Sequence, residues 1–217
     1  MSILMCIEAK SNIKCNAVRS YASITVSDFS KTVEVNMHEK RFNREIERLR
    51  DPERLNRLEV DRVVDLAKAG LARNSSVLDI GTGSGVFAEA FAKQGVKVSG
   101  IDANPEMLPV ASTYIPAGTF EEGIAEDLPY SDDSFDLVFM GLLLHETDDP
   151  QKAVNEAFRV TRRRLSILEW RKEEQPFGPP LGDRLSEQQI VAFGHEAGFK
   201  EITINKLRDL VLYCLEK

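Results

Sequence analysis

Two hydrophobic periods alternate along most of the chain. From residue 76 onward, short apolar runs typical of buried strands are separated by segments in which apolar residues recur every three or four positions, as on one face of a helix. The pattern predicts strands at about 76–80, 97–101, 119–122, 135–142, 165–169, 200–205 and 210–215. Strands that alternate with helices favour a mainly parallel sheet covered on both faces.

The last two predicted strands are connected differently from the others. Only residues 206–209 separate them, which is too short for a crossover helix, so they must form an antiparallel hairpin. We therefore expect an α/β fold, a three-layer α-β-α sandwich around a seven-stranded, mostly parallel sheet with a C-terminal antiparallel hairpin strand.

The segment before the first strand divides into an arm and a cap. Residues 1–36 contain local alternation that permits a short strand or two. Residues 37–70 are expected to form a helical cap, with helices at 39–50 and 52–68 and with Asp51-Pro52 starting the second. Residues 37–217 together would form the main domain, and Met37 is a candidate internal start at which that unit would begin. Further helix starts carry capping residues, at Asn104-Pro105, Asp149-Pro150 and Ser186 with Gln189.

Composition narrows the class of protein. The chain has 217 residues, 42% of them hydrophobic, which is enough for one soluble α/β domain with an N-terminal attachment. Its net charge of -7 argues against a nucleic-acid substrate, because that affinity depends on basic residues. The basic cluster 162–164 is expected at a helix end, where cations are favoured.

Cysteines and apolar stretches point to a cytoplasmic protein. Cys6, Cys15 and Cys214 match no zinc spacing, so we expect free thiols and no metal site. No apolar stretch approaches the roughly 20 residues of a membrane span, so no membrane partner is expected.

The most informative motif is the glycine-rich turn after the first predicted strand. Residues 77–85, Val-Leu-Asp-Ile-Gly-Thr-Gly-Ser-Gly, combine a buried strand, an acid and a turn that opens a helix. Asp102 ends the next apolar run, and this pairing is how a βαβ unit builds a nucleoside site. A dinucleotide site needs a third glycine where Val86 stands, whereas here Asp79 precedes a G-x-G-x-G turn.

These residues resemble the S-adenosylmethionine (SAM) site of class I methyltransferases. The resemblance covers roughly residues 40–217. This part of the chain is similar to small methyltransferases of prokaryotes, of the ubiquinone/menaquinone-methyltransferase-like kind. It implies SAM as the cofactor and a small-molecule methyl acceptor as the partner. The further motifs that carry it are Arg41-Phe42, Asp51-Pro52-Glu53-Arg54-Leu55, His145-Glu146, Trp170-Arg171-Lys172-Glu173 and Gly178-Pro179-Pro180.

The resemblance assigns cofactor contacts residue by residue. Asp79 would organise the turn and face the cationic amino end of SAM, and Asp102 would accept hydrogen bonds from both ribose hydroxyls. Ala103 would lie beside the adenine edge. The turn itself, which must approach the ligand closely, contributes Gly81, Thr82, Gly83 and Gly85.

The adenine contact departs from the family pattern. Residues 123–129 resemble the family segment G-D-A-x-x-L-P, but Ile124 stands where the family has the Asp that accepts from the adenine amino group. Because Ile124 cannot make that bond, the backbone of Ala125 and the side chain of Glu126 are the expected substitutes. The alternative for Glu126 is a solvated turn.

Candidate catalytic residues follow the fourth and fifth predicted strands. A sulfonium methyl group is already activated, so the protein mainly aligns the reactants and excludes water. His145 is the candidate general base, and Glu146 and Glu169 are placed to orient it or the substrate. The alternative is that His145 only caps a helix or lies in a loop. Trp170 either lines the substrate cavity or packs in the core.

Two other functions remain open at this point. An NAD(P)-dependent oxidoreductase would use the same βαβ unit, and a non-catalytic SAM-binding module would explain Ile124 and the small catalytic set. The acceptor pocket is expected between the N-terminal helices and the long loop 171–185. The N-terminal arm would either cover that pocket or exchange between the subunits of a homodimer.

Overall fold

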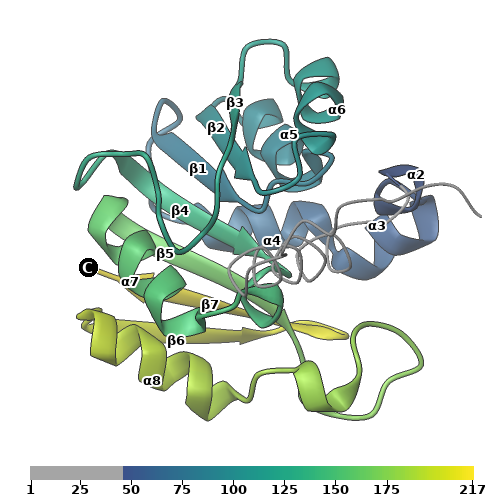
Figure 1. The fold of residues 1–217 in the computed structure, drawn as a ribbon, viewed down its shortest axis with the longest axis vertical. Coiled ribbons are helices and arrows are strands. Elements are labelled where there is room, and N and C mark those ends of the chain that lie inside the picture. Colours follow the sequence, from purple (N-terminus) through teal and green to yellow (C-terminus); the bar gives the residue numbers. More distant parts are fainter. Residues whose placement is uncertain (1–45) are drawn as a thin grey trace, which may run out of the picture. The chain divides into compact units, whose positions relative to one another are not determined.

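A seven-stranded sheet forms the centre of the part that this computed structural model describes, residues 46–217 (Figure 1). The strand order is β3-β2-β1-β4-β5-β7-β6. β7 runs antiparallel to both of its neighbours, and the other neighbouring pairs are parallel, so the expected terminal hairpin is confirmed. The strands are β1 (Ser76–Ile80), β2 (Lys97–Asp102), β3 (Thr119–Glu122), β4 (Phe135–Gly141), β5 (Thr161–Trp170), β6 (Glu201–Lys206) and β7 (Leu210–Glu216).

Helices cover both faces of the sheet and complete the expected three layers (Figure 1). One face packs against α4 (Val60–Ala67), α5 (Val86–Lys93) and α6 (Met107–Tyr114), and the other against α7 (Pro150–Val160) and α8 (Glu187–Ala197). The sheet residue Phe139 shows how tightly the first face packs, because its ring centroid lies 4.9 Å from that of Phe87 and 5.3 Å from that of Phe91.

Several expectations lie outside the described residues. These are the arm at 1–36, the Arg41-Phe42 motif, Cys6, Cys15 and the first part of the helix expected at 39–50. Its end is present as α2 (Ile46–Leu49). Within residues 46–217, no helix has the length and apolarity needed to cross a membrane.

The single helix expected at 52–68 is divided in two at Glu59. α3 (Pro52–Leu58) ends there and α4 begins, because Glu59 has a left-handed backbone with φ of 48°. The side chain of Glu59 accepts a 2.8 Å hydrogen bond from the backbone N–H of Arg208, so the junction is fixed to the turn between β6 and β7. The expected N-cap is confirmed, since the Asp51 carboxylate accepts from two N–H groups of the first turn.

The basic cluster 162–164 lies in a strand, so its assignment to a helix end was wrong. α7 ends at Val160 and β5 begins at the next residue. Arg162 donates to the Asp136 carboxylate at 2.6 Å, and Arg164 pairs with Glu216. The cations therefore neutralise carboxylates at the amino end of β5 instead of a helix dipole.

Of the other three predicted helix starts, two are confirmed and one lies further along the chain. Asp149 caps α7, and Ser186 with Gln189 forms the expected capping box of α8. α6 begins at Met107 rather than at Asn104-Pro105, because the Asn104 side chain first accepts from the N–H of Glu106 in a turn.

Candidate functional site

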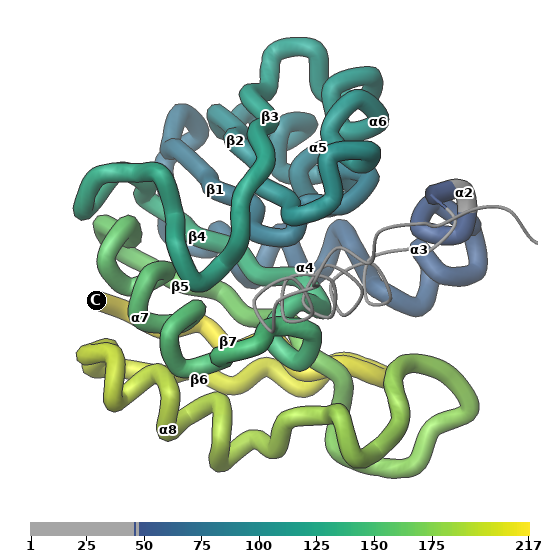
Figure 2. The backbone as a smooth tube through the Cα atoms, in the orientation of Figure 1, coloured from purple at the N-terminus to yellow at the C-terminus, as the bar shows by residue number. Residues whose placement is uncertain are grey.

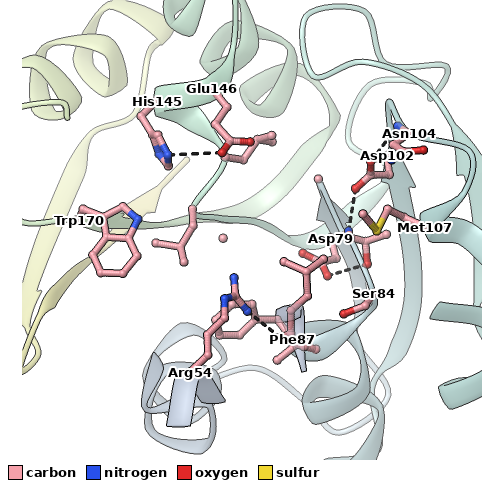
Figure 3. A pocket seen from close by; sticks show the side chains of 18 residues that line it. Arg54, Asp79, Ser84, Phe87, Asp102, Asn104, Met107, His145, Glu146 and Trp170 are labelled. Atoms are coloured by element: carbon pink, nitrogen blue, oxygen red, sulfur yellow. Dashed lines mark hydrogen bonds and ion pairs between the residues drawn. The ribbon is translucent and has the colours of Figure 1, made fainter. Parts of the chain in front are cut away.

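The carboxyl ends of β1, β2, β4 and β5 meet at one edge of the sheet around a pocket (Figure 3). The enclosed part of this pocket, here called the cofactor pocket, measures about 130 Å³. Its walls come from the glycine turn after β1, the end of β2, the segment after β4 and the cap helices. The pocket brings together seven of the predicted site residues, namely Asp79, Gly81, Thr82, Gly83, Asp102, His145 and Glu146.

The glycine turn is held closely against the end of β2. The N–H groups of Gly81 and Thr82 both donate to the Ile101 carbonyl, at 2.8 and 3.0 Å. Gly81 has φ of +68°, and a Cβ atom there would lie 2.7 Å from Cδ1 of Leu143. Only glycine fits both the backbone conformation and the space. The helix that follows this turn, α5, begins at Val86.

Asp102 connects the glycine turn to the start of the next segment. Its Oδ2 accepts from the N–H of Gly83 at 2.7 Å, and its Oδ1 accepts from the N–H of Asn104 at 2.9 Å. Burial raises the pKa of this carboxyl above its usual range, and the two N–H bonds oppose that shift. Each carboxylate oxygen retains a second lone pair, so two ribose hydroxyls have acceptors here.

Asp79 is a second buried carboxyl on the same pocket. Its side chain is almost fully buried, and Thr82 Oγ1 donates to its Oδ2 at 2.8 Å. Burial, with the charge of Asp102 adding to it, raises the pKa of Asp79 to about 7 against the opposing hydrogen bond from Thr82. A cation in the pocket would favour the ionised carboxylate.

Gly85 lies beside the pocket and has a packing role. Its φ is +77°, and a Cβ atom there would lie 2.9 Å from Ile115 Cδ1 and 3.1 Å from Ala111 Cα. The missing side chain therefore lets α6 approach the start of α5. This explains the third glycine without any ligand contact.

The residues predicted to contact adenine lie outside the walls of the cofactor pocket. Ala103, Ala125 and Glu126 are not among the described residues that line the cofactor pocket. Ala125 is buried in the core, and Glu126 Oε1 accepts from the N–H groups of Asp148 and Asp149 at the start of α7. Their contacts with adenine stay predictions.

His145 and Glu169 form a buried pair at the far side of the pocket. His145 lies in the 3-10 helix η1 (Leu144–Glu146), and its Nδ1 is 2.8 Å from Oε2 of Glu169 at the end of β5. The two side chains are only 4% and 2% exposed. We assign the ring proton to Nδ1, because the carboxylate can only accept there. The lone pair then lies on Nε2, which is 3.7 Å from Glu146 Oε1.

Pattern analysis missed the pocket residues that depend on tertiary contacts. Arg54 extends from α3 into the pocket (Figure 3), and its Nη1 donates to the Leu49 carbonyl at 2.8 Å. Its motif was recognised, but no role followed from it. Asn104 and Met107 also line the pocket, and their positions just after Asp102 could have indicated this.

Arg50 attaches the cap to the glycine turn. Its guanidinium donates to the Ser84 carbonyl at 2.8 Å and to Glu89 at 2.7 Å. The same group lies over the Tyr114 ring, 3.3 Å from its centroid. One side chain therefore joins the cap to α5 and α6 at the edge of the pocket.

Comparison with known proteins finds similar methyltransferases. Residues 78–165 match a family model described as a methyltransferase domain. The solved structure of a SAM-dependent methyltransferase from Aquifex aeolicus is similar, with a TM-score of 0.67 and 28% identity over 79% of this chain and 96% of that chain. Residues 78–165 thus match a methyltransferase-domain family, and the fold is similar to that of a SAM-dependent methyltransferase.

Two curated relatives are similar to part of this chain. The uncharacterized methyltransferase YcgJ of Bacillus subtilis is 37% identical over 107 residues, which are 46% of this chain and 42% of the relative. A demethylmenaquinone methyltransferase of Chlorobaculum parvum is 38% identical over 91 residues, 42% of this chain and 38% of the relative. The chain thus matches about two fifths of the length of each.

The residues of the cofactor pocket fit SAM, the compound named in the description of the similar Aquifex aeolicus structure. The glycine turn leaves room that a side chain at Gly81 would fill. Asp79 and Asp102 offer carboxylates to a cation and to ribose hydroxyls. Ser84 Oγ lines the same pocket, is buried and has no hydrogen-bond partner among the described residues, so a polar ligand would satisfy it.

Proposed function

We propose that the protein transfers a methyl group from SAM to a small-molecule acceptor by in-line displacement, with His145 as the general base. The observation that carries this proposal is the shared pocket, in which the glycine turn and Asp102 lie opposite a histidine held by Glu169. When bound, SAM supplies a methyl group already activated by its sulfonium charge.

The chain's own residues would bind and align the reactants. Asp102 accepts from the ribose hydroxyls, and Asp79 pairs with the amino group of the cofactor. The cap carries Leu49 over the glycine turn, where its Cδ1 would lie 3.6 Å from a Cβ built on Gly83. This cover excludes water from the line between nucleophile and methyl carbon.

His145 would remove the proton from the acceptor. Its Nε2 takes the proton as the nucleophilic atom attacks, and the Glu169 carboxylate stabilises the imidazolium that forms at Nδ1. Glu146, 3.7 Å from Nε2, would orient the acceptor's hydrogen-bond donor.

Several features support a small organic acceptor over a nucleic acid. The net charge of -7 disfavours a polyanion, and one relative is named as a demethylmenaquinone methyltransferase. The pocket lies between the cap and the sheet edge, where a small molecule is enclosed on several sides. We place the reaction in the cytoplasm.

Ligand-dependent unfolding tests the cofactor. We expect S-adenosylhomocysteine (SAH) at about 100 times its Kd to stabilise the protein by about 2.7 kcal/mol, and NAD to leave the melting temperature unchanged. Stabilisation by NAD instead would support the oxidoreductase alternative and overturn the proposal.

A transfer assay tests the reaction. Purified protein is incubated with SAM that carries a labelled methyl group and with a broad panel of phenols, thiols, amines and acids. We expect labelled product and SAH in equal amounts, with His145→Gln as the inactive control that still binds SAH. Tight SAH binding with no product from any acceptor would instead favour the non-catalytic SAM-binding module.

A further inference from the structure

A second, larger cavity adjoins the cofactor pocket. It measures about 790 Å³ and lies between the cap helices and the loop 171–185. The loop, α2 and α3 all lie beyond the same end of the strands (Figure 2). Both cavities have Leu49, Arg54 and Trp170 in their walls, so a molecule in the second cavity can reach the cofactor pocket.

The charged side chains around the second cavity favour an anion. They are Arg48, Arg54 and Arg57 on the basic side and Asp51 and Glu53 on the acidic side. The Asp51 carboxylate already accepts two N–H bonds as the N-cap of α3, which offsets its charge. An excess of arginine here is unusual for a chain whose net charge is -7. Guanidinium groups bind carboxylates in a bidentate, planar geometry.

The opposite wall is aromatic. The Trp170 and Phe177 rings have centroids 5.9 Å apart at a tilt of 48°, and the Arg57 guanidinium lies 4.1 Å from the Phe177 centroid. The Arg57 guanidinium covers one face of Phe177, and a flat ring would pack against the remaining aromatic surface of this wall more closely than a puckered one.

This wall is held rigidly by the loop itself. Arg184 is 3% exposed, and its guanidinium donates to the backbone carbonyls of four loop residues and to the Gln175 side chain. Gly178 has φ of +86°, and a Cβ atom there would lie 2.9 Å from Trp170 Cδ2. The loop backbone thus packs directly against the indole and fixes its orientation.

We propose that the methyl acceptor is a planar aromatic anion whose carboxylate binds Arg54 and Arg57 and whose ring packs against Trp170 and Phe177. This inference rests on the proposed function, since the cavity matters only if methyl transfer occurs next to it. The carboxylate end lies toward α3, and the nucleophilic hydroxyl or amine lies toward His145 in the cofactor pocket.

The step that follows is balanced without any further reactant. The acceptor oxygen or nitrogen forms a bond to the methyl carbon, and the carbon–sulfur bond breaks with its electron pair remaining on sulfur. SAH is released as the product, and the acceptor proton goes to His145 Nε2. The carboxylate takes no part and is released unchanged.

Saturation-transfer NMR and calorimetry on the full chain with SAH bound test this inference. Three probes differ in one property each: 4-hydroxybenzoate, its neutral amide 4-hydroxybenzamide, and the non-planar anion trans-4-hydroxycyclohexanecarboxylate. We expect 4-hydroxybenzoate to bind about tenfold more tightly than either of the others, the size of one charged hydrogen bond or one ring stack. Equal affinities, or binding of none of the three, would overturn the inference.

Variants identify the residues responsible. Among the contacts described, the Arg57 side chain only stacks on Phe177. Arg57→Gln should therefore lower the affinity for 4-hydroxybenzoate about tenfold and leave the affinity for the amide unchanged. Arg62→Gln is the matched control, because that arginine is 57% exposed on α4 and outside the cavity wall. An equal loss in both variants would also overturn the inference. SAH binding is measured in the same samples. If SAH does not bind, the proposed function is contradicted; if SAH binds and the probes do not discriminate as expected, only the inference about the acceptor is contradicted.

Discussion

Glu169 holds both the ring and the backbone of His145. One carboxylate oxygen lies 2.8 Å from Nδ1, and the other accepts the backbone N–H of the same residue at 3.2 Å. The two residues are 24 positions apart: Glu169 lies near the end of β5, and His145 lies in η1, shortly after the adjacent strand β4 ends. The position of the ring is therefore set by the sheet and does not depend on a ligand.

Replacing Glu169 by Gln should separate the positioning of the base from cofactor binding. The amide can donate to Nδ1 and so stabilise the wrong tautomer, and it cannot stabilise the imidazolium. We expect kcat to fall about 10²-fold or more with SAH affinity unchanged, measured by steady-state kinetics and calorimetry. An acceptor that is already ionised at the assay pH should be methylated at nearly the wild-type rate, and a similar loss with that acceptor would contradict the role. Glu201→Gln, at an exposed position of β6 away from the pocket, is the matched control and should leave kcat unchanged.

SAM binding should release a proton from Asp79 near pH 6. The folded pKa of about 7 lies above the ordinary value of 3.8, so the folded, unliganded protein keeps a proton that the unfolded chain has lost. Stability from this group is therefore full below pH 4 and decreases as the pH rises to 7. A bound cation favours the carboxylate, and SAM affinity should rise over the same pH range.

Calorimetry in two buffers of different ionisation enthalpy measures the proton release. At pH 6 we expect nearly one proton per SAM bound for the wild type. Asp79→Asn should release almost none and bind SAM more weakly. Equal proton release in both proteins would assign the effect to another group.

The inner part of the sheet was predictable because strands such as β1, β4 and β7 are buried along almost their whole length. Continuous apolar runs such as the one in β4, where Val138 and Phe139 are fully buried on opposite faces, leave little choice of structure. The division at Glu59 was not predictable, since it depends on a hydrogen bond to a residue 149 positions away. The local pattern of 52–68 contains no trace of that contact.

The candidate site was predictable to the extent that it is local in sequence. The turn from Asp79 to Gly83 and Asp102 lie within one βαβ unit, so their spacing defines their geometry. Arg54 and Trp170 share a cavity wall only because the cap and the end of β5 meet in the folded chain. Charge and aromaticity at separate places in a sequence do not indicate such a meeting.

Substitution at Gly85 should test its packing role. Gly85→Ala introduces a Cβ atom 3.1 Å from Ala111 Cα in addition to the left-handed backbone strain. Gly70→Ala is the matched control, because Gly70 has the same φ of +77° and nothing within 4 Å of the added atom. We expect the control to lose about 1 kcal/mol and Gly85→Ala about 1–3 kcal/mol more in urea unfolding. Equal losses would show that the contact with α6 is unimportant.

Removal of the Arg50 side chain should loosen the cap. Arg50→Ala loses the bonds to the Ser84 carbonyl and to Glu89, together with the stacking on Tyr114. We expect a loss of about 1–3 kcal/mol in stability and a severalfold weaker SAH Kd, from chemical unfolding and calorimetry. Lys93→Ala, which removes the exposed second partner of Glu89, should change neither value measurably. Unchanged SAH affinity in Arg50→Ala would contradict this role of the cap.

The bonds of Arg184 also have an evolutionary consequence. Four of its five acceptors are backbone carbonyls, and these are present whatever side chains the loop carries. The shape of residues 171–185 thus depends little on their other side chains as long as Arg184 and Gly178 are kept. Exchanges at positions such as Phe177 would alter acceptor preference while the sheet and the cofactor turn are inherited unchanged. Side chains in this loop can thus be exchanged between related proteins, and their acceptor preference can change, while the backbone of the loop keeps its shape.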